Sequence, residues 1–289
     1  MAATPLVVTE PATMRAAVLA ARAAGRRVGF VPTMGALHEG HARLVAAAAT
    51  DCVDVAVSIF VNPTQFAPGE DFDRYPRTFA ADRDLLAAHG VRWIYAPDAA
   101  AVYPPGDATR VVVAGPALGF EGDVRPGHFS GVATVVCRLF LAVPADVAYF
   151  GAKDWQQTLV VRRMVADLGL PIEIVVRPTI READGLALSS RNRYLSAADR
   201  GRAAALAESL AEAASLWEQA ATPTAIGAAM RARLVAAGVA VDYAVVVDPE
   251  SLAAEVNDAV GAVALVAGRL GTTRLIDNRL LPPRRTERR

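Results

Sequence analysis

The sequence predicts an α/β protein with a doubly wound, Rossmann-like parallel sheet and a smaller C-terminal α+β domain. Between residues 28 and 176, short apolar segments alternate with helix-like segments, which is the pattern of βαβ units. One apolar segment, VDVAVSIFV (53–61), is apolar almost throughout, as expected of a parallel strand covered on both faces. After Arg177-Pro178 the alternation stops, so we expect the first domain to end there.

The elements of the N-terminal part follow from their boundary residues. One predicted helix ends at Gly25 and another at Gly90, each just before an apolar strand. The segment that contains VVVAG (111–115) is predicted to be irregular. In chain order, we predict a helix at 13–24, a strand at 28–31, a helix at 40–50, a strand at 53–61, a helix at 79–89, a strand at 91–97, a helix at 130–141, a strand at 147–150, a helix at 154–168 and a strand at 172–176.

The C-terminal part has a different order of elements. A polar loop (181–193) precedes a long alanine-rich helix (197–220) and a second helix near 224–237. The segments VDYAVVVD, AVALVAG and TRLIDNRLL then predict three strands. We therefore predict two domains, a Rossmann-like domain at 1–179 and a smaller domain at 180–289.

Composition and charge exclude several classes of protein. Thirty basic and thirty acidic residues give a formal net charge of zero, whereas a nucleic-acid binder shows a basic excess. No uncharged apolar stretch reaches about 18 residues, and the first residues lack the features of a signal peptide. We therefore expect a cytoplasmic protein with no nucleic-acid partner and no membrane segment. Cys52 and Cys137 lie in apolar segments without metal-ligand spacing, which predicts buried, reduced thiols.

Two of the four histidines stand three residues apart in FVPTMGALHEGHARLV (30–45). His38 and His41 follow a predicted strand and open a predicted helix, and this turn is a favoured phosphate site in doubly wound folds. Gly35 and Gly40 let the backbone approach a ligand closely. A zinc site is the alternative, but it usually needs more nitrogen and sulfur ligands, and HEGH lacks the spacing of a zinc-binding helix. The pattern favours nucleotide phosphates.

A second polar cluster lies in GLALSSRNRYL (185–195). Ser189 and Ser190 offer hydroxyl donors, and Arg191 offers a planar guanidinium that fits phosphate oxygens and can stabilise a departing pyrophosphate. A capped turn would equally explain the serines.

A third element, FGAKDWQQ (150–157), follows another predicted strand. Gly151 permits close approach, Lys153 supplies a point charge for a phosphate, and Asp154 is a candidate for a ribose hydroxyl or for a helix cap. A simple N-capped helix would explain Asp154 but not Lys153.

Five segments in order, PTMGALHEGH, SIFVNPTQF, RPGHFSGVATVV, FGAKDWQQ and READGLALSSRNRYL, together resemble the pantothenate synthetases (pantoate–β-alanine ligases), a family of HxGH nucleotidyltransferases. The resemblance covers residues 28 to 195. It implies a two-step reaction: pantoate attacks the α-phosphate of ATP to give pantoyl adenylate and pyrophosphate, and β-alanine then displaces AMP. It also implies Mg²⁺ on the triphosphate and a homodimer.

The resemblance also implies a role for particular residues. His41 would be the proton donor, acting with His38, Lys153, Ser189, Ser190 and Arg191. Gln65, Gln157 and Met34 would bind pantoate. Val135 and Val136 would pack against its dimethyl group, although helix core would also explain these valines. The ATP site would comprise Pro32, Thr33, Met34, Gly35, His38, Gly40, His41, Gly151, Lys153, Asp154, Ile180, Leu188, Ser189, Ser190 and Arg191.

Two positions depart from the family pattern. Leu188 stands where the family usually has methionine, a change between apolar side chains of similar volume. The acidic segment near the metal is AAD (80–82) here, which leaves Asp82 as the nearby carboxylate for Mg²⁺.

The loop NPTQFAPGEDFDRYPRT (62–78) is too long for a routine connection. A lid would keep water from an acyl adenylate, and the candidates for closing contacts are Asp71, Asp73, Arg74 and Tyr75. EGDVRPGHFSG (121–131) is a second candidate gate, in which Arg125 would reach a substrate or the lid. His128 is predicted to be a structural hydrogen-bonding residue.

Two other functions fit parts of the pattern. One is an HxGH adenylyltransferase that leaves the nucleotide on its product, although Gln65 and Gln157 suit a small hydroxy acid better. The other is a nucleotide-binding module without turnover, which would not need the full set of histidines, Lys153 and Arg191.

Overall fold

The computed structural model describes residues 4–284, and the chain divides into two compact units. The N-terminal unit comprises the residues up to Ala152 and Gln156–Pro178, and the C-terminal unit comprises Lys153–Trp155 and the residues from Thr179 onward. Among the described residues, no helix is both long enough and apolar enough to cross a membrane. Both cysteines are free thiols; Cys52 is buried and Cys137 is half-buried.

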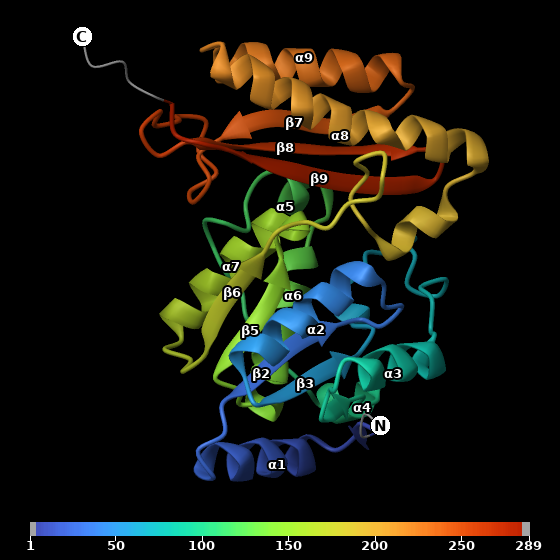
Figure 1. Cartoon of the computed structure of the whole chain (residues 1–289), viewed down its shortest axis with the longest axis vertical. Coiled ribbons are helices and arrows are strands. Elements are labelled where there is room, and N and C mark those ends of the chain that lie inside the picture. The colour runs from blue at the N-terminus through green and yellow to red at the C-terminus, as the bar shows by residue number, and fades with distance from the viewer. Residues whose placement is uncertain (1–3, 285–289) are drawn as a thin grey trace. The chain divides into compact units, whose positions relative to one another are not determined.

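The N-terminal unit is built on one six-stranded parallel sheet, ordered β1-β4-β3-β2-β5-β6 (Figure 1). This confirms the predicted fold class. The short edge strand β1 was not predicted, because three residues carry no usable alternation. The strands are β1 (Leu6–Val8), β2 (Val28–Thr33), β3 (Asp54–Ile59), β4 (Trp93–Tyr95), β5 (Val147–Gly151) and β6 (Glu173–Arg177).

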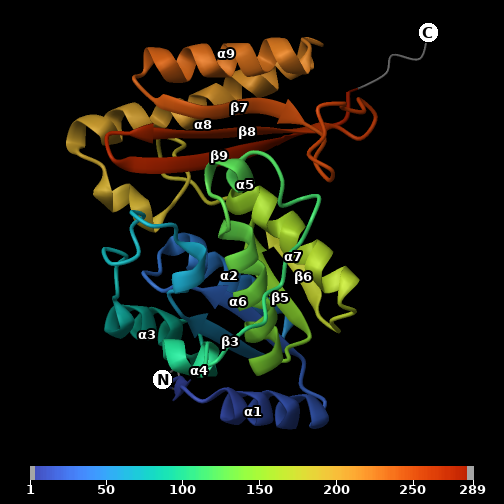
Figure 2. The same cartoon turned by 180° about the vertical axis from the view of Figure 1, so that it is seen from behind.

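Helices cover both faces of this sheet (Figures 1 and 2). Helices α2 (Glu39–Asp51) and α3 (Phe79–Ala88) share one apolar core with the sheet residues Val31 and Val57. Helices α1 (Pro11–Ala23), α6 (His128–Ala142) and α7 (Trp155–Asp167) share another core with Phe30 and Ala56. Neighbouring strand residues thus point to opposite cores, which explains why these strands are apolar almost throughout. The short helices of this part are η1 (Pro63–Gln65), α4 (Ala99–Val102), α5 (Glu121–Val124) and η2 (Ala152–Asp154).

The C-terminal unit is an antiparallel sheet of β7 (Ala240–Val247), β8 (Ala262–Leu270) and β9 (Thr273–Leu281). Helices α8 (Ala197–Glu218) and α9 (Pro223–Ala236) pack on one face of it (Figure 1). Trp217 of α8 is fully buried in the core that these helices share with the strands. Ser196 and Thr222 cap the two helices with side-chain oxygens that accept backbone N–H bonds. A 3₁₀ helix, η3 (Ser190–Tyr194), precedes α8.

Candidate functional site

The predicted site residues of the N-terminal unit gather at the carboxyl edge of its sheet. Strand β2 lies between β3 and β5 in the sheet. Helix α2, which connects β2 to β3, covers one face of the sheet, and helix α7, which follows β5, covers the opposite face. This reversal is the position at which doubly wound folds bind ligands. The loop after β2 carries both histidines, and the segment after β3 carries Gln65.

The two histidines cap helix α2 reciprocally. Nδ1 of His38, the N-cap residue, accepts a hydrogen bond from the Gly40 N–H (3.1 Å), and Nδ1 of His41 accepts one from the His38 N–H (3.3 Å). Their ring centroids lie 4.2 Å apart. Because each Nδ1 is an acceptor, the proton of each neutral ring is on Nε2. The spacing of the motif therefore fixes two imidazoles in the same tautomer at a helix N-terminus, where anions bind.

The loop between β2 and α2, residues 34–38, is here named the histidine loop. Thr33 anchors its start, because its hydroxyl donates to the Ser58 carbonyl (2.6 Å) and accepts from the Gly35 N–H (3.1 Å). Asp82 anchors its middle, accepting from the N–H groups of Ala36 and Leu37. Asp82 is 2% exposed, so its predicted role as a ligand of Mg²⁺ does not fit this arrangement.

The side-chain amide of Gln65 has a defined orientation. Asn62 is buried, and its Oδ1 accepts from the Thr64 N–H (3.3 Å) and the Tyr103 hydroxyl (2.7 Å), so its Nδ2 faces the other way. That Nδ2 donates to the Gly131 carbonyl (3.2 Å) and to Gln65 Oε1 (3.1 Å). Nε2 of Gln65 lies 3.0 Å from the sulfur of Met34. The network therefore turns the N–H donors of Gln65 toward Met34, a second predicted substrate contact.

Helix α6 passes very close to the segment that carries Gln65. A Cβ on Gly131 would overlap the Thr64 carbonyl oxygen and would lie 2.8 Å from Gln65 Cα. Only glycine fits there, because both neighbours are backbone. Val135 and Val136, one turn further along α6, are each 5% exposed within the hydrophobic core. Core packing accounts for both valines, and their contact with substrate stays a prediction.

The two adjacent glutamines of DWQQ have different environments. Gln156 is buried and anchors the segment before α5, donating to the carbonyls of Pro116 (3.0 Å) and Leu118 (3.0 Å) and accepting from the Glu121 N–H (3.0 Å). Gln157, the predicted pantoate contact, is only partly buried. The sequence gives no sign of which glutamine is structural.

The 62–78 loop is held by aromatic contacts and by one ion pair. Phe66 stacks edge-on against Phe72 (centroids 5.4 Å apart) and against the buried Tyr75 (6.1 Å). Arg125, in the second predicted gate, binds both oxygens of Glu70 in the loop. Arg125 was predicted to reach either a substrate or the lid, and in this structure it binds Glu70 of the predicted lid.

His128 is a structural hydrogen-bonding residue, as predicted. Its Nδ1 lies 2.9 Å from the Gln65 carbonyl and its Nε2 lies 3.0 Å from Arg125 Nη1. A carbonyl only accepts and a guanidinium only donates, so Nδ1 carries the proton and Nε2 is the acceptor. Burial, helped by the charge of Arg125, lowers the pKa of His128 to about 4. The neutral ring therefore ties the backbone of Gln65 to the Arg125–Glu70 pair.

In the C-terminal unit, the predicted nucleotide segment forms a tight, cross-braced loop. Leu188 N–H donates to the Ile180 carbonyl (2.9 Å), which brings these two predicted residues together. Ser189 caps η3 by accepting from the Arg191 N–H (3.3 Å), so the capped-turn interpretation holds for this serine. Arg181 clamps the loop to β9 through both oxygens of the buried Asp277 (2.6 and 3.0 Å).

Lys153 and Asp154 directly follow β5 in the chain. The Lys153 carbonyl accepts from Asn278 Nδ2 (2.7 Å), and Lys153 Nζ lies 3.9 Å from Asp154 Oδ1. The Lys153 side chain is 19% exposed, so its ammonium group is only partly covered by protein. A Cβ on Gly151 would have no neighbour within 4 Å among the described residues, so protein packing does not require glycine there.

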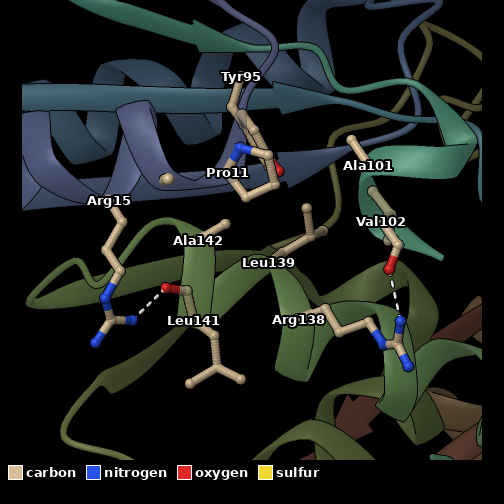
Figure 3. A pocket seen from close by; sticks show the side chains of 10 residues that line it. Pro11, Arg15, Tyr95, Ala101, Val102, Arg138, Leu139, Leu141 and Ala142 are labelled. Carbon is tan, nitrogen blue, oxygen red and sulfur yellow. Dashed lines mark hydrogen bonds between the residues drawn. The ribbon is translucent and has the colours of Figure 1, made fainter. Parts of the chain in front are cut away.

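A separate hollow lies between α1, α4 and α6 (Figure 3). It has a volume of 240 Å³ and is mostly apolar. The two arginines at its edge are bound to carbonyl groups, Arg15 to Leu141 and Arg138 to Val102. It contains none of the predicted site residues, so we assign it no function.

Several residues of the site were not found from the sequence. Asn62 and Gln156 lie inside motifs, and Gln156 stands beside a second glutamine, from which the sequence does not separate it. Tyr103 lies outside the quoted motifs and Glu70 lies in a long loop, and their partners are tens of residues away in the chain. Of these four residues, only Asn62 has a local signal, because Asn62-Pro63 is a typical turn dipeptide.

These features define the N-terminal unit as a doubly wound α/β domain in which two histidines cap a helix at the switch point, the position at which such folds bind ligands. Comparison with known proteins makes the assignment specific. The chain matches the family described as Pantoate-beta-alanine ligase over residues 6–280. The pantothenate synthetase of Acidiphilium cryptum is 54% identical over 265 residues, which cover 91% of this chain and 95% of that protein.

Solved structures agree with this match. The crystal structure of pantothenate synthetase from Thermus thermophilus has a TM-score of 0.91 at 49% identity, and the match covers 96% of this chain and 100% of that chain. Pantoate-beta-alanine ligase from Francisella tularensis, complexed with beta-gamma ATP and beta-alanine, has a TM-score of 0.79 at 31% identity, covering 96% and 97%. The chain therefore belongs to the pantoate-beta-alanine ligase family, which confirms the resemblance seen in its five motifs.

Proposed function

We propose that this chain catalyses the ATP-dependent condensation of pantoate with β-alanine to pantothenate, through a pantoyl-adenylate intermediate. The observation that carries the proposal is the pair of imidazoles fixed with Nε2–H at the switch point, on a loop whose Met34 contacts the oriented amide of Gln65. The Francisella tularensis relative is complexed with beta-gamma ATP and beta-alanine, which supports ATP and β-alanine as ligands of this chain.

In the first step, a carboxylate oxygen of pantoate attacks the α-phosphorus of ATP, and the bond to pyrophosphate breaks. The Nε2–H groups of His38 and His41 donate hydrogen bonds to phosphate oxygens, with His41 donating its bond to the departing group and keeping its proton. Lys153, Ser189, Ser190 and Arg191 neutralise the charge that develops on pyrophosphate. We assign the following further residues to ATP binding: Pro32, Thr33, Met34, Gly35, Gly40, Gly151, Asp154, Ile180 and Leu188.

Pantoate is held by two half-buried amides. Gln65 donates through Nε2 to a carboxylate or hydroxyl oxygen, and Gln157 supplies a second amide. In the second step the unprotonated amine of β-alanine attacks the acyl carbon, and AMP leaves. The 62–78 loop keeps water away from the adenylate between the two steps.

Mg²⁺ enters with the substrate, as MgATP. Hard phosphate oxygens and water suit this ion, and Asp82 is already engaged by three donors. We also propose that the protein is a cytoplasmic homodimer, on its composition and on the general preference of such enzymes for symmetric dimers. Light scattering of the purified chain tests the dimer.

One assay tests the function. ATP, Mg²⁺, pantoate and β-alanine are supplied, and AMP and pyrophosphate are followed. AMP formation that requires both acids is the expected result. Pyrophosphate release without AMP would indicate adenylyl transfer instead, and no turnover would leave a nucleotide-binding module.

A further inference from the structure

A buried carboxylate holds the histidine loop. Asp82 lies on the first turn of α3, and both of its oxygens accept hydrogen bonds. Oδ2 accepts from the Ala36 N–H (3.0 Å), whereas Oδ1 accepts from the Leu37 N–H (2.9 Å) and from the Thr78 hydroxyl (3.1 Å). Three donors therefore surround one carboxylate, and two of them are consecutive backbone amides of the loop.

The backbone of the loop needs such an anchor. Gly35 and Ala36 both have left-handed φ angles, 81° and 50°. This conformation is unfavourable for a residue with a side chain, and Ala36 adopts it. Consecutive amides in a turned backbone form a concave anion site, and here Asp82 supplies the anion. His38 follows two residues later, so the position of the helix cap depends on this turn.

The same geometry leaves no room for a cation on Asp82. A Cβ on Gly35 would lie 3.0 Å from Oδ2, which means that the loop backbone itself covers the carboxylate. Mg²⁺ requires a near-octahedral oxygen shell and gives up its waters reluctantly. Within the described part of the chain, no three histidine, cysteine, aspartate or glutamate side chains are grouped so that they could hold a metal ion.

We propose that Asp82 is a positioning residue for the nucleotide-binding histidine loop and is not a ligand of Mg²⁺. The proposal rests on the proposed function, in that this loop is the one assigned to ATP. Because Thr78 is the last residue of the 62–78 loop, one carboxylate anchors both the histidine loop and the end of the predicted lid.

The anchor is tested first without any substrate. Amide hydrogen exchange is measured on the full-length protein as wild type, Asp82→Asn and Asp84→Asn. Asparagine keeps the shape but places an N–H₂ group against a backbone N–H. We expect exchange at Ala36 and Leu37 to become at least ~10-fold faster in Asp82→Asn, since hydrogen bonds to charged acceptors are among the strongest. Asp84 is exposed on the same helix, and its variant should match the wild type. Unchanged protection in Asp82→Asn would overturn the proposal.

Nucleotide binding then separates positioning from metal ligation. AMP binding is measured by calorimetry in EDTA, and the Mg²⁺ concentration for half-maximal turnover is measured at saturating ATP. Positioning predicts that Asp82→Asn weakens metal-free AMP binding at least ~10-fold and leaves the Mg²⁺ requirement unchanged. A raised Mg²⁺ requirement with normal AMP binding would identify a metal ligand and reject the proposal.

A second substitution distinguishes a specific effect on the histidine loop from a general loss of folded structure. Ala36→Gly removes the side chain that disfavours the left-handed turn, so the double variant Asp82→Asn/Ala36→Gly should recover part of the AMP binding. Glycine at position 36 could not replace a lost metal ligand, and absence of recovery would count against positioning. Absence of turnover in the wild-type protein would contradict the proposed function. It would not affect the test of Asp82, because the hydrogen-exchange measurement needs no substrate.

Discussion

Arg125 binds both carboxylate oxygens of Glu70, with Nε 2.8 Å from Oε1 and Nη2 2.6 Å from Oε2. Both side chains are largely buried, at 14% and 24% exposure. Burial alone would raise the pKa of Glu70, but its hydrogen bond to Arg125 and the arginine's charge lower that pKa below its usual range. Glu70 is therefore ionised at neutral pH, and the pair joins the 62–78 loop to the segment before α6.

Breaking the Arg125–Glu70 pair should let water reach the adenylate past the 62–78 loop. In Glu70→Gln the loop keeps its aromatic contacts but loses the paired charge, so water should reach the adenylate more often. We expect AMP formation from ATP and pantoate without β-alanine to rise ~5-fold or more, with pantothenate formation reduced. Asp84→Asn, an acid-to-amide change at an exposed position outside the loop, is the control. Equal β-alanine-independent AMP formation in both variants would remove the pair from the closing mechanism.

The two ring nitrogens of His41 can be tested separately. His41→Asn places an acceptor near the Nδ1 position and keeps the helix cap, whereas His41→Gln reaches the Nε2 position and loses the cap. If Nε2–H donates to the phosphates, His41→Asn should lower kcat at least ~100-fold with normal thermal stability. His41→Gln should retain more activity but a lower Tm. The reverse order would show that the motif acts through its cap alone.

Tyr103 should control pantoate binding from a distance. Tyr103→Phe removes the hydroxyl that donates to Asn62 Oδ1, which loosens the amide that orients Gln65. We expect the KM for pantoate to rise ~3–10-fold, the size of effect expected for the loss of one hydrogen bond. The kcat and the KM for ATP should stay near the wild-type values. Gln65→Ala should show the same selectivity with a larger effect. Tyr149→Phe also removes a buried hydroxyl bond, to Asp51, and should leave all three constants unchanged.

The pKa of His128 makes the fold less stable in acid. The folded-state pKa is about 4, below the usual value of 6.5, so between these values the unfolded chain binds a proton that the folded chain does not. Stability is therefore fully present above about pH 6.5 and falls as the pH falls toward 4. From pH 7 to pH 5 this group alone should remove about 2 kcal/mol.

Reversible urea denaturation at the two pH values checks this expectation. His128→Asn keeps an N–H donor for the Gln65 carbonyl but cannot titrate. Between pH 7 and pH 5, its free energy of unfolding should therefore fall by about 2 kcal/mol less than that of the wild type. His89→Asn, at an exposed position, should behave as the wild type. An equal pH dependence in wild type and His128→Asn would mean that His128 has an ordinary pKa.

The sequence was most informative where the signal is local. His38 and His41 could be singled out because a strand, a turn and a helix start are contiguous, whereas Gln65 was assigned only through the family resemblance. Residues that act through distant contacts could not be found, since Tyr103 and Asn62 are 41 positions apart and Arg125 and Glu70 are 55 apart. Asp82 was assigned to the metal because the resemblance implies an acidic segment near Mg²⁺, in which Asp82 is the carboxylate that this chain retains. Only the structure reveals the amides that surround it.

Gly131 tests how tightly α6 positions the pantoate site. In Gly131→Ala the new methyl group would overlap the Thr64 carbonyl, and neither backbone can move without shifting Gln65. We expect a loss of roughly 1–3 kcal/mol in the free energy of unfolding, as for other overpacked cores. The KM for pantoate should rise, because the displaced segment carries the oriented amide. Gly201 lies in α8, and a Cβ added there would meet none of the described atoms within 4 Å. Gly201→Ala should therefore stabilise the fold by about 0.5–1 kcal/mol. If Gly131→Ala lowered stability but bound pantoate normally, Gln65 would not be the residue that holds it.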